Sequence, residues 1–365
     1  MNKTTLELPE LVSTLILFEI GSTTLFMIGS KAKQDAWIAL GIAAAVGLVL
    51  TILHLAIYYR DSKRDLFELC RHYFGKWIGT IIGLAFACYF AYEASRVLRD
   101  LGELTTLVLL NRTPLIIILV IGLLVVGNTV RYGARVLFLT CLALFPVMIL
   151  SYLFLVGVVW GTGLIDFKQI FPVLEYGWKP VWDAAFPEVV VFPFGQVVLF
   201  LVFLPMLKSR RKIRRSILLA YAFVVCLLIM INQLNFLVLG PTLVAKSTIP
   251  LLQIIQLIEL IDVFERMDVL FVLILFMGLG IKMAAFYVGA VTGIHKLTGI
   301  SYVKWVVPIG AIILGCSLIS PTYTHHIWLG LKKVTPWFLV FQIGLPLMLF
   351  LVILVRQKIN RIKPS

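Results

Sequence analysis

The sequence has few charged residues for its length. Only 14% of its 365 residues are Asp, Glu, Lys or Arg, whereas 61% are hydrophobic and the mean hydropathy is +1.02. A soluble domain carries about 25% charged residues. Apolar runs of about 20 residues, the length that crosses a bilayer, recur along the whole chain. The composition therefore predicts an all-α polytopic membrane protein that forms one integral membrane domain over residues 1–365.

Residue patterns of catalysis and metal binding are also missing. The five cysteines are scattered without CxxC spacing, the five histidines form no HExxH motif, and neither a P-loop nor a serine elbow occurs. We therefore expect no metal, no cofactor and no enzymatic activity, and we interpret the cysteines as small buried hydrophobic residues.

The net charge of +14 has a simple explanation in a membrane protein. Basic residues gather in the segments between apolar runs, above all in "KSRRKIRR" at 208–215. Such clusters mark cytoplasmic loops, so no nucleic-acid partner is expected. The N-terminal "NKTTLELPE" lacks the basic region and the cleavage site of a signal peptide, so the first apolar run is expected to stay as a span.

Ten apolar segments are predicted to span the membrane, and basic residues orient them. With a cytoplasmic N-terminus, twenty Lys and Arg fall in cytoplasmic loops and eight in the opposite loops, which places both termini in the cytoplasm. Two non-cytoplasmic loops, 161–183 and 241–266, are long, and the second contains an amphipathic stretch expected to lie along the membrane surface. The predicted spans are 10–30, 37–58, 78–108, 114–131, 135–160, 184–207, 216–240, 267–294, 301–320 and 335–355.

The ten spans divide into two sets of five, 10–160 and 184–355. The first span of each set contains helix breakers: "FEIGSTTLF" at 18–26 and "FPEVVVFPFGQ" at 186–196. Interrupted spans at equivalent places in two halves are typical of inverted-repeat transporters, which bind their substrate near the midplane. Unwinding at Gly21, Ser22, Thr23 and Thr24 would expose backbone groups that suit a zwitterionic amino acid, although these residues could also simply ease helix packing.

The third span carries an unusual set of charges. Glu93, Arg96, Asp100 and Glu103 follow a spacing of three and four, which places them on one helical face, with Arg99 within reach of Glu103. Charges at membrane depth normally pair or face water. The set is therefore either a structural ladder of ion pairs near the non-cytoplasmic end of the span, or Glu93 or Arg96 faces a ligand cavity or gate. Asp100 and Glu103 are expected to be solvated at the rim.

Further candidates lie in spans six and eight. Lys282 is too deep to reach the interface, and a buried lysine can replace a sodium ion, act as a proton-linked switch, or pair with Glu93 or Glu188. Glu188 follows Pro187 and could belong to an outer gate. The aromatic side chains Phe192, Phe194, Phe286 and Tyr287 could line a small pocket, or pack against helices and lipid.

Several stretches together resemble the spore germination permease family, the B subunits of nutrient germinant receptors within the amino acid–polyamine–organocation superfamily. They are "LNRTP" (110–114), "GARVL" (133–137), the region 171–215 and the region 247–287 with "FERMD" (264–268). The resemblance implies a leucine-transporter-like fold of ten spans in the inner membrane of a bacterial endospore. It also implies partner A and C subunits.

The resemblance further implies a ligand pocket among spans one, three, six and eight. It would consist of Gly21, Ser22, Thr23, Thr24 and Leu25; Tyr89, Glu93 and Val97; Phe192, Pro193, Phe194 and Gly195; and Lys282, Met283, Phe286 and Tyr287.

Three functions are compatible with this sequence. The first is a nutrient sensor whose ligand shifts a conformational equilibrium read by partner subunits. The second is a proton-coupled amino acid symporter, and the third is a channel for water or ions. A small apolar amino acid suits the expected pocket, while sugars and nucleosides stay open as ligands.

Overall fold

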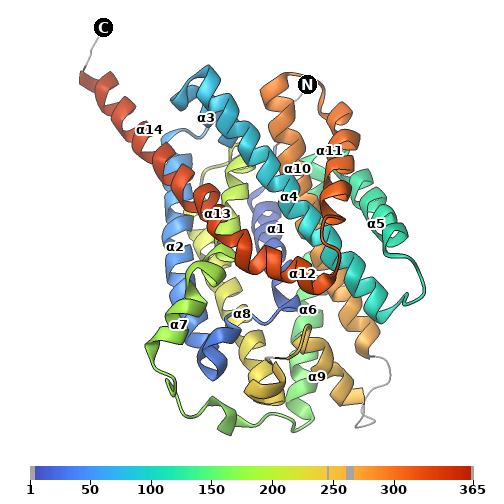
Figure 1. Ribbon diagram of the computed structural model, residues 1–365. Helices are drawn as coiled ribbons and strands as arrows, with labels where there is room; N and C mark the ends of the chain where they lie inside the picture. Colours follow the sequence, from blue (N-terminus) through green and yellow to red (C-terminus); the bar gives the residue numbers. More distant parts are fainter. Residues whose placement is uncertain (1–4, 245, 260–266, 363–365) are drawn as a thin grey trace.

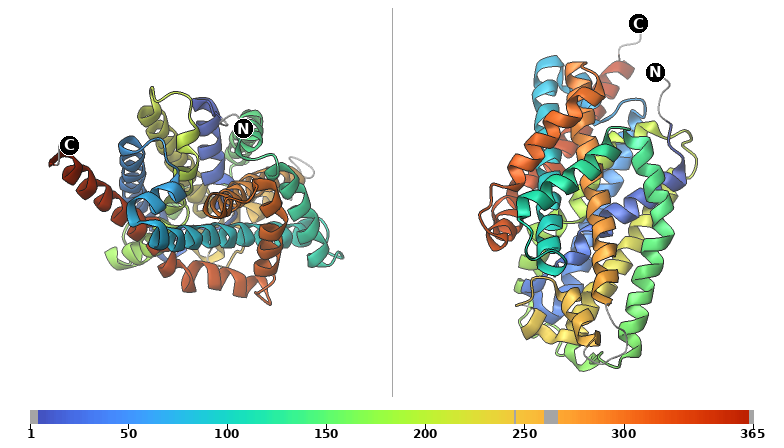
Figure 2. Two further views of the ribbon diagram at one scale, coloured as in Figure 1. Left: turned by 90° about the horizontal axis from the view of Figure 1, so that it is seen from above. Right: turned by 90° about the vertical axis from the view of Figure 1, so that its right-hand side faces the viewer.

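The backbone is helical over most of its length. The computed structural model describes residues 5–244, 246–259 and 267–362. Within these ranges the only β-type pairing is an isolated parallel bridge between Leu6 and Leu207. The long helices run between the two ends of an elongated body (Figures 1 and 2). The prediction of an all-helical protein is confirmed.

Among the described residues, eight helical segments are long and apolar enough to cross a membrane. Two further predicted spans, 114–131 and 301–320, correspond to shorter apolar helices. A polytopic membrane protein is therefore confirmed, and the count of ten crossings stays a prediction. The eight segments are Leu8–Leu25, Ser30–Arg60, Lys76–Val108, Ala134–Gly161, Trp178–Val202, Ile213–Val244, Val269–Thr298 and Thr335–Ile359.

The first half of the chain runs through six helices with two short 3₁₀ turns near its start. The elements are α1 (Leu8–Gly21), η1 (Thr23–Leu25), η2 (Ser30–Asp35), α2 (Ala36–Arg60), α3 (Leu66–Phe74), α4 (Lys76–Val108), α5 (Leu115–Val130) and α6 (Ala134–Gly161).

The second half contains more short and irregular turns. Its 3₁₀ segments are η3 (Phe167–Ile170), η5 (Phe194–Val202) and η6 (Leu204–Met206), and its π-helical turns are η4 (Ala185–Val189), η7 (Leu329–Lys333) and η8 (Val340–Gly344). Its α-helices are α7 (Trp178–Ala184), α8 (Ile213–Val244), α9 (Pro250–Glu259), α10 (Met267–Thr298), α11 (Tyr302–Ser317), α12 (Tyr323–Trp328), α13 (Thr335–Leu339) and α14 (Leu345–Ile362).

Both predicted helix breaks occur where the breakers stand. The α-helical part of the first span ends at Gly21, and a 3₁₀ turn follows. In the sixth span, α7 gives way to a π turn in which Phe186 leaves the helical region, with φ −124° and ψ 132°. Pro187 and Pro193 lack the backbone N–H that a regular α-helix requires. The first and sixth spans are therefore interrupted in the structure at the helix breakers from which the interruptions are predicted.

Four elements meet at the centre of the body. The helix α4 has 33 residues, about 50 Å at 1.5 Å per residue, and runs obliquely across α10 (Figure 1). The helix α1 packs against α10, and η5 packs against both. Spans one, three, six and eight thus form one buried junction.

The two ends of the body differ in which segments they hold. The helix α1 begins and α14 ends toward the end that carries α3, whereas α7 and α9 lie toward the other end (Figures 1 and 2). In α9 the side chains of Gln253 and Gln256 are exposed while Ile254, Ile255 and Ile258 are buried, so the predicted amphipathic stretch is helical. Residues 260–266 of that loop, and the start of "FERMD", lie outside the described residues.

Candidate functional site

The break after α1 lies against α10 at a glycine pair. A Cβ added to Gly21 would overlap the backbone of Gly278, so the two helices approach at backbone distance. Two of the hydroxyls at the break already have partners. Thr23 donates to the carbonyl oxygen of Glu19, and the hydroxyls of Thr24 and Tyr152 on α6 lie 2.8 Å apart. Ser22 and Leu25 are buried beside them.

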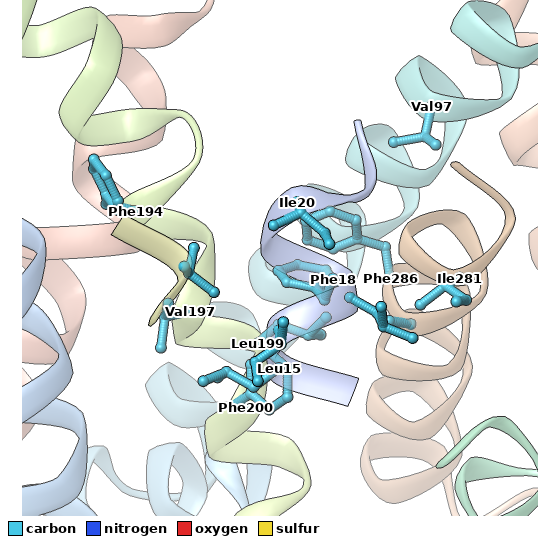
Figure 3. Packing of buried hydrophobic residues seen from close by; sticks show 14 of the residues in the cluster. Leu15, Phe18, Ile20, Val97, Phe194, Val197, Leu199, Phe200, Ile281 and Phe286 are labelled. Atoms are coloured by element: carbon cyan, nitrogen blue, oxygen red, sulfur yellow. The ribbon is translucent and has the colours of Figure 1, made fainter. Parts of the chain in front are cut away.

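An aromatic cluster fills the junction next to this glycine contact. The ring centroid of Phe18 on α1 lies 5.1 Å from that of Phe286 on α10 and 5.4 Å from that of Phe200 on η5. Figure 3 shows α1 held between η5 and α10 by these rings. Aromatic pairs at this spacing stabilise packing beyond the effect of their buried area. The cluster therefore forms a closely packed aromatic wall beside the buried side chains of Glu19 and Lys282.

Two ionisable side chains, Glu19 and Lys282, lie within this wall without a hydrogen-bond partner among the described residues. Lys282 is fully buried, and its Nζ lies 4.7 Å from the ring centroid of Phe192 and 5.1 Å from that of Phe18. Among the described residues neither Lys282 Nζ nor either carboxylate oxygen of Glu19 has a hydrogen-bond partner. Glu19 is 1% exposed. The two groups interact electrostatically through the protein interior.

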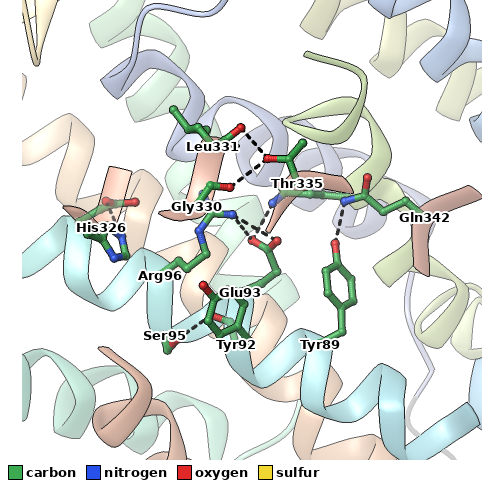
Figure 4. A network of polar contacts seen from close by, with 12 residues as sticks. Tyr89, Tyr92, Glu93, Ser95, Arg96, His326, Gly330, Leu331, Thr335 and Gln342 are labelled. Atoms are coloured by element: carbon green, nitrogen blue, oxygen red, sulfur yellow. Dashed lines mark hydrogen bonds and ion pairs between the residues drawn. The ribbon is translucent and has the colours of Figure 1, made fainter. Parts of the chain in front are cut away.

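A second polar network starts from Glu93 on α4 (Figure 4). Its Oε2 accepts a hydrogen bond of 2.9 Å from Gln196 Nε2 on η5, and its Oε1 lies 3.4 Å from a guanidinium nitrogen of Arg96. One helical turn earlier, the Tyr89 hydroxyl accepts a 2.7 Å bond from Gln342 Nε2 on η8. The network therefore connects α4, η5 and η8.

The charges of α4 continue toward the end of the body that holds α9. Arg99 donates from Nε to Glu103 Oε1 at 2.8 Å and from a terminal nitrogen to the carbonyl of Ser317 at 3.1 Å. Asp100 lies 3.4 Å from Nε2 of His326 on α12. The predicted pairing of Arg99 with Glu103 is confirmed. Asp100 is buried at 5% exposure, which rules out a solvated rim position for it.

A cavity of about 480 Å³ opens beside the break after α1. Glu188 lies in its wall and forms an ion pair of 2.7 Å with Lys31. Phe26 also lines this cavity, and its ring packs at 6.2 Å from that of Phe192, which covers Lys282. A chain of contacts from Phe26 through Phe192 therefore connects the cavity wall with Lys282.

The structure brings some of the predicted site residues together and directs others elsewhere. Tyr287 points away from the centre, since its hydroxyl donates to the Val306 carbonyl on α11. Phe194 faces Tyr221 on α8, at 5.7 Å between centroids, and stands apart from the Phe18 cluster in Figure 3. Four more residues of the predicted pocket are buried: Val97, Pro193, Gly195 and Met283. The Pro193 carbonyl accepts from the Gln196 N–H, and Gly195 lies against Oε1 of Gln342.

Three polar residues of the junction are absent from the sequence predictions: Glu19, Gln196 and Gln342. The sequence does distinguish Glu19. It is the one charged residue between Glu10 and Lys31, and it stands two residues before the helix break at Gly21. A charge inside an apolar span marks a functional position by default. The two glutamines carry no charge, and nothing local in the sequence distinguishes them.

Fold and junction together define a polytopic helical membrane protein with an occluded, charged centre between two interrupted segments and two long helices. The sequence pattern of the spore germination protein family matches residues 5–326. The chain belongs to the spore germination permease family.

Named relatives in Bacillus subtilis (strain 168) show the same relationship. Spore germination protein KB is 32% identical over 362 residues, which cover 98% of this chain and 97% of that protein. Spore germination protein B2 is 25% identical over 218 residues, 58% of each chain. Spore germination protein A2 is 28% identical over 169 residues, which cover 46% of this chain and 45% of that protein.

Proposed function

We propose that the chain is the nutrient-sensing B subunit of a spore germinant receptor. In this proposal a small nutrient, an amino acid, binds where α1, α4, η5 and α10 meet, and occupancy is signalled to partner subunits. The observation that carries the proposal is the buried, unpartnered charge of Glu19 and Lys282 at this junction. Burying a charge without partners is costly, so a protein that retains such groups has a use for them.

The proposal includes a leucine-transporter-like arrangement of ten spans in two inverted repeats. Its support is the position of the two interrupted segments, one in the first span of each half. In such folds the substrate lies beside the interrupted helices. Of the residues in the predicted pocket, Gly21, Tyr89, Glu93, Phe192 and Phe286 border the junction, and we assign the ligand to their neighbourhood.

We further propose that the end carrying α3 and both chain ends faces the cytoplasm of the endospore, with the protein in the inner membrane. The excess of basic residues in the loops on that side supports this orientation. The ion pair of Glu188 with Lys31 would then belong to an outer gate above the cavity. Assembly with A and C subunits belongs to the same proposal and rests on the family.

A proton-coupled amino acid symporter is the second candidate. The observation in its favour is the same pair of buried ionisable groups, since a carboxylate and an amine without fixed partners can exchange protons during a transport cycle. Uptake of labelled amino acid into vesicles that contain only this chain distinguishes the two. A symporter accumulates substrate under an imposed proton gradient, whereas a sensor binds without net uptake.

The test of the sensor is germination. We expect spores lacking this chain to lose their response to one nutrient and to keep their response to others. Complementation with the intact gene restores the response. Normal responses of the deleted spores to every nutrient, in a strain without a duplicate of this gene, would refute the proposal.

A further inference from the structure

Basic side chains gather around a depression at the start of α8, where α2 ends. The depression measures about 530 Å³, and α8 lines it with Lys212, Arg214 and Arg215. All three side chains are exposed, and within the described ranges none of them forms an ion pair. Tyr59 of α2 also lines the depression, and its hydroxyl accepts a hydrogen bond of 3.2 Å from the Arg214 backbone N–H. The depression therefore presents three positive charges that the protein itself leaves without a counter-charge.

An apolar groove adjoins this charged depression. It measures about 460 Å³ and is formed by α1, α6 and α8, with Val12, Phe145 and Phe223 among its lining side chains. The two hollows share Leu219, which is 60% exposed. The depression involves residues 212–219 of α8 and the groove residues 216–223. The groove therefore begins about one helical turn further along α8 than the depression.

The order of the two hollows along α8 matches the two parts of a phospholipid in a bilayer. The membrane segment that contains α8 starts at Ile213, so the charged depression lies at the level of the headgroups and the groove reaches into the hydrocarbon. Tyrosine is enriched at the headgroup level, where Tyr59 stands. Basic pockets between membrane helices bind anionic lipid headgroups. The depression thus suits a phosphate, and the groove suits an acyl chain.

Other occupants match only one of the two hollows. A small free anion would pair with the basic side chains and leave the apolar groove unfilled. A zwitterionic lipid would fill the groove, but its ammonium group would be repelled by the three cations. An extended peptide at this depth would have to satisfy its backbone polar groups without water. An anionic phospholipid meets both requirements in one molecule.

We propose that this surface binds an anionic phospholipid, with its phosphate against Lys212, Arg214 and Arg215 and an acyl chain in the groove between α1 and α8. The lipid site is separate from the proposed nutrient site and does not rest on the proposed function. Because α1 forms one wall of the groove, the acyl chain packs directly against the helix that ends at the Gly21 break.

The experiment combines matched lipids with matched variants. Purified protein in detergent is titrated with dioleoylphosphatidylglycerol, with dioleoylphosphatidylcholine, which has the same chains and a zwitterionic headgroup, and with glycerol 3-phosphate, which lacks the chains. Binding is measured by native mass spectrometry. The variant Arg214→Gln/Arg215→Gln removes two charges from the depression, and the control Arg210→Gln/Arg211→Gln removes two from the same basic run outside its lining. Ser216→Trp places a large ring in the groove.

The unaltered protein should bind the phosphatidylglycerol about 10-fold or more tightly than the phosphatidylcholine, and should not bind glycerol 3-phosphate. Arg214→Gln/Arg215→Gln should lose most of this preference, whereas the control should keep it. Ser216→Trp should weaken both lipids, because its ring occupies the place of the acyl chain. Phosphatidylcholine binding that is unchanged in Arg214→Gln/Arg215→Gln shows that this variant is folded.

Several results would overturn the proposal. Equal loss of the preference in both double variants would mean that the whole basic run attracts anionic lipid without a defined site. Equal binding of the two lipids by the unaltered protein, or binding of neither, would refute lipid selection, and tight binding of glycerol 3-phosphate would leave an anion site alone. A photoreactive benzoylphenylalanine in place of Leu219 should crosslink to lipid in spore membranes. Crosslinking to a protein instead would assign the groove to a partner subunit.

Discussion

At the scale of the residue, the protein is defined by charges that lie deep in an apolar body. Glu93 is 1% exposed and is held by both Gln196 and Arg96, whereas Glu103, ten residues along the same helix, is about one-fifth exposed. Removing one partner of a buried ion pair leaves the other uncompensated and costs about 3–5 kcal/mol. Glu103 pairs with the buried Arg99, but Arg99 also donates to the Ser317 carbonyl and Glu103 itself reaches solvent. The two glutamates of α4 should therefore differ in consequence.

This difference predicts the outcome of a matched pair of substitutions. Glu93→Gln should raise the nutrient concentration for half-maximal germination at least ~10-fold, and Glu103→Gln should raise it less than ~3-fold, since a tenfold change corresponds to about 1.4 kcal/mol. The measurement is the dose response of spores that carry each variant at equal protein level. Equal and negligible effects of the two would assign the charges of α4 to structure alone.

At the scale of the element, the interruption of the first span allows α1 to pack closely against α10 and also lies beside the proposed ligand site. Gly21 ends α1 where its backbone meets that of Gly278, and no side chain fits between them. The small residue thus permits the close approach that small residues commonly allow between membrane helices. Phe18 and Glu19 lie in the last turn of the same helix, so this contact also fixes their position relative to α10.

Substituting this glycine should therefore destabilise the protein. Gly21→Ala forces a methyl group against the Gly278 backbone, and overpacking of this kind costs about 1–3 kcal/mol. Gly41→Ala on α2 is the matched control, because a Cβ there has no atom within 4 Å, and alanine favours a helix by up to about 1 kcal/mol. Thermal unfolding in detergent should show a lower Tm for the first and an equal or higher Tm for the second. A Tm unchanged by Gly21→Ala would contradict the close contact.

Most helical elements were predictable from the sequence, and the orientation of several side chains was not. Hydropathy locates the apolar segments because each must be long enough to cross hydrocarbon, and Gly21, Pro187 and Pro193 locate the interruptions. Tyr287 and Phe194, however, face α11 and α8 rather than the centre. The π turn before η5 changes the helical phase, so residue spacing alone does not assign a face to Phe194. Tyr287 lies in the continuous helix α10, about 100° around the helix from Phe286, so these two neighbours face different helices.

At the scale of the whole molecule, two long helices and two interrupted segments enclose one centre, and a cavity approaches it from one side. Phe192 and Phe26 stand between this cavity and Lys282. In the proposed function, a ligand that enters from this cavity displaces these rings. A sensor requires such a change between two states, because a ligand shifts an equilibrium only through its different affinity for each.

The most direct test is thermal stabilisation of the purified protein by the twenty amino acids, several sugars and several nucleosides. A compound at 100 times its Kd should stabilise the folded state by about 2.7 kcal/mol. The account predicts a stereospecific rise in Tm with one small amino acid and a loss of that rise in Glu19→Gln. No rise with any compound, for the chain alone and for the assembled receptor, would contradict the claim that this protein senses a nutrient at its charged centre.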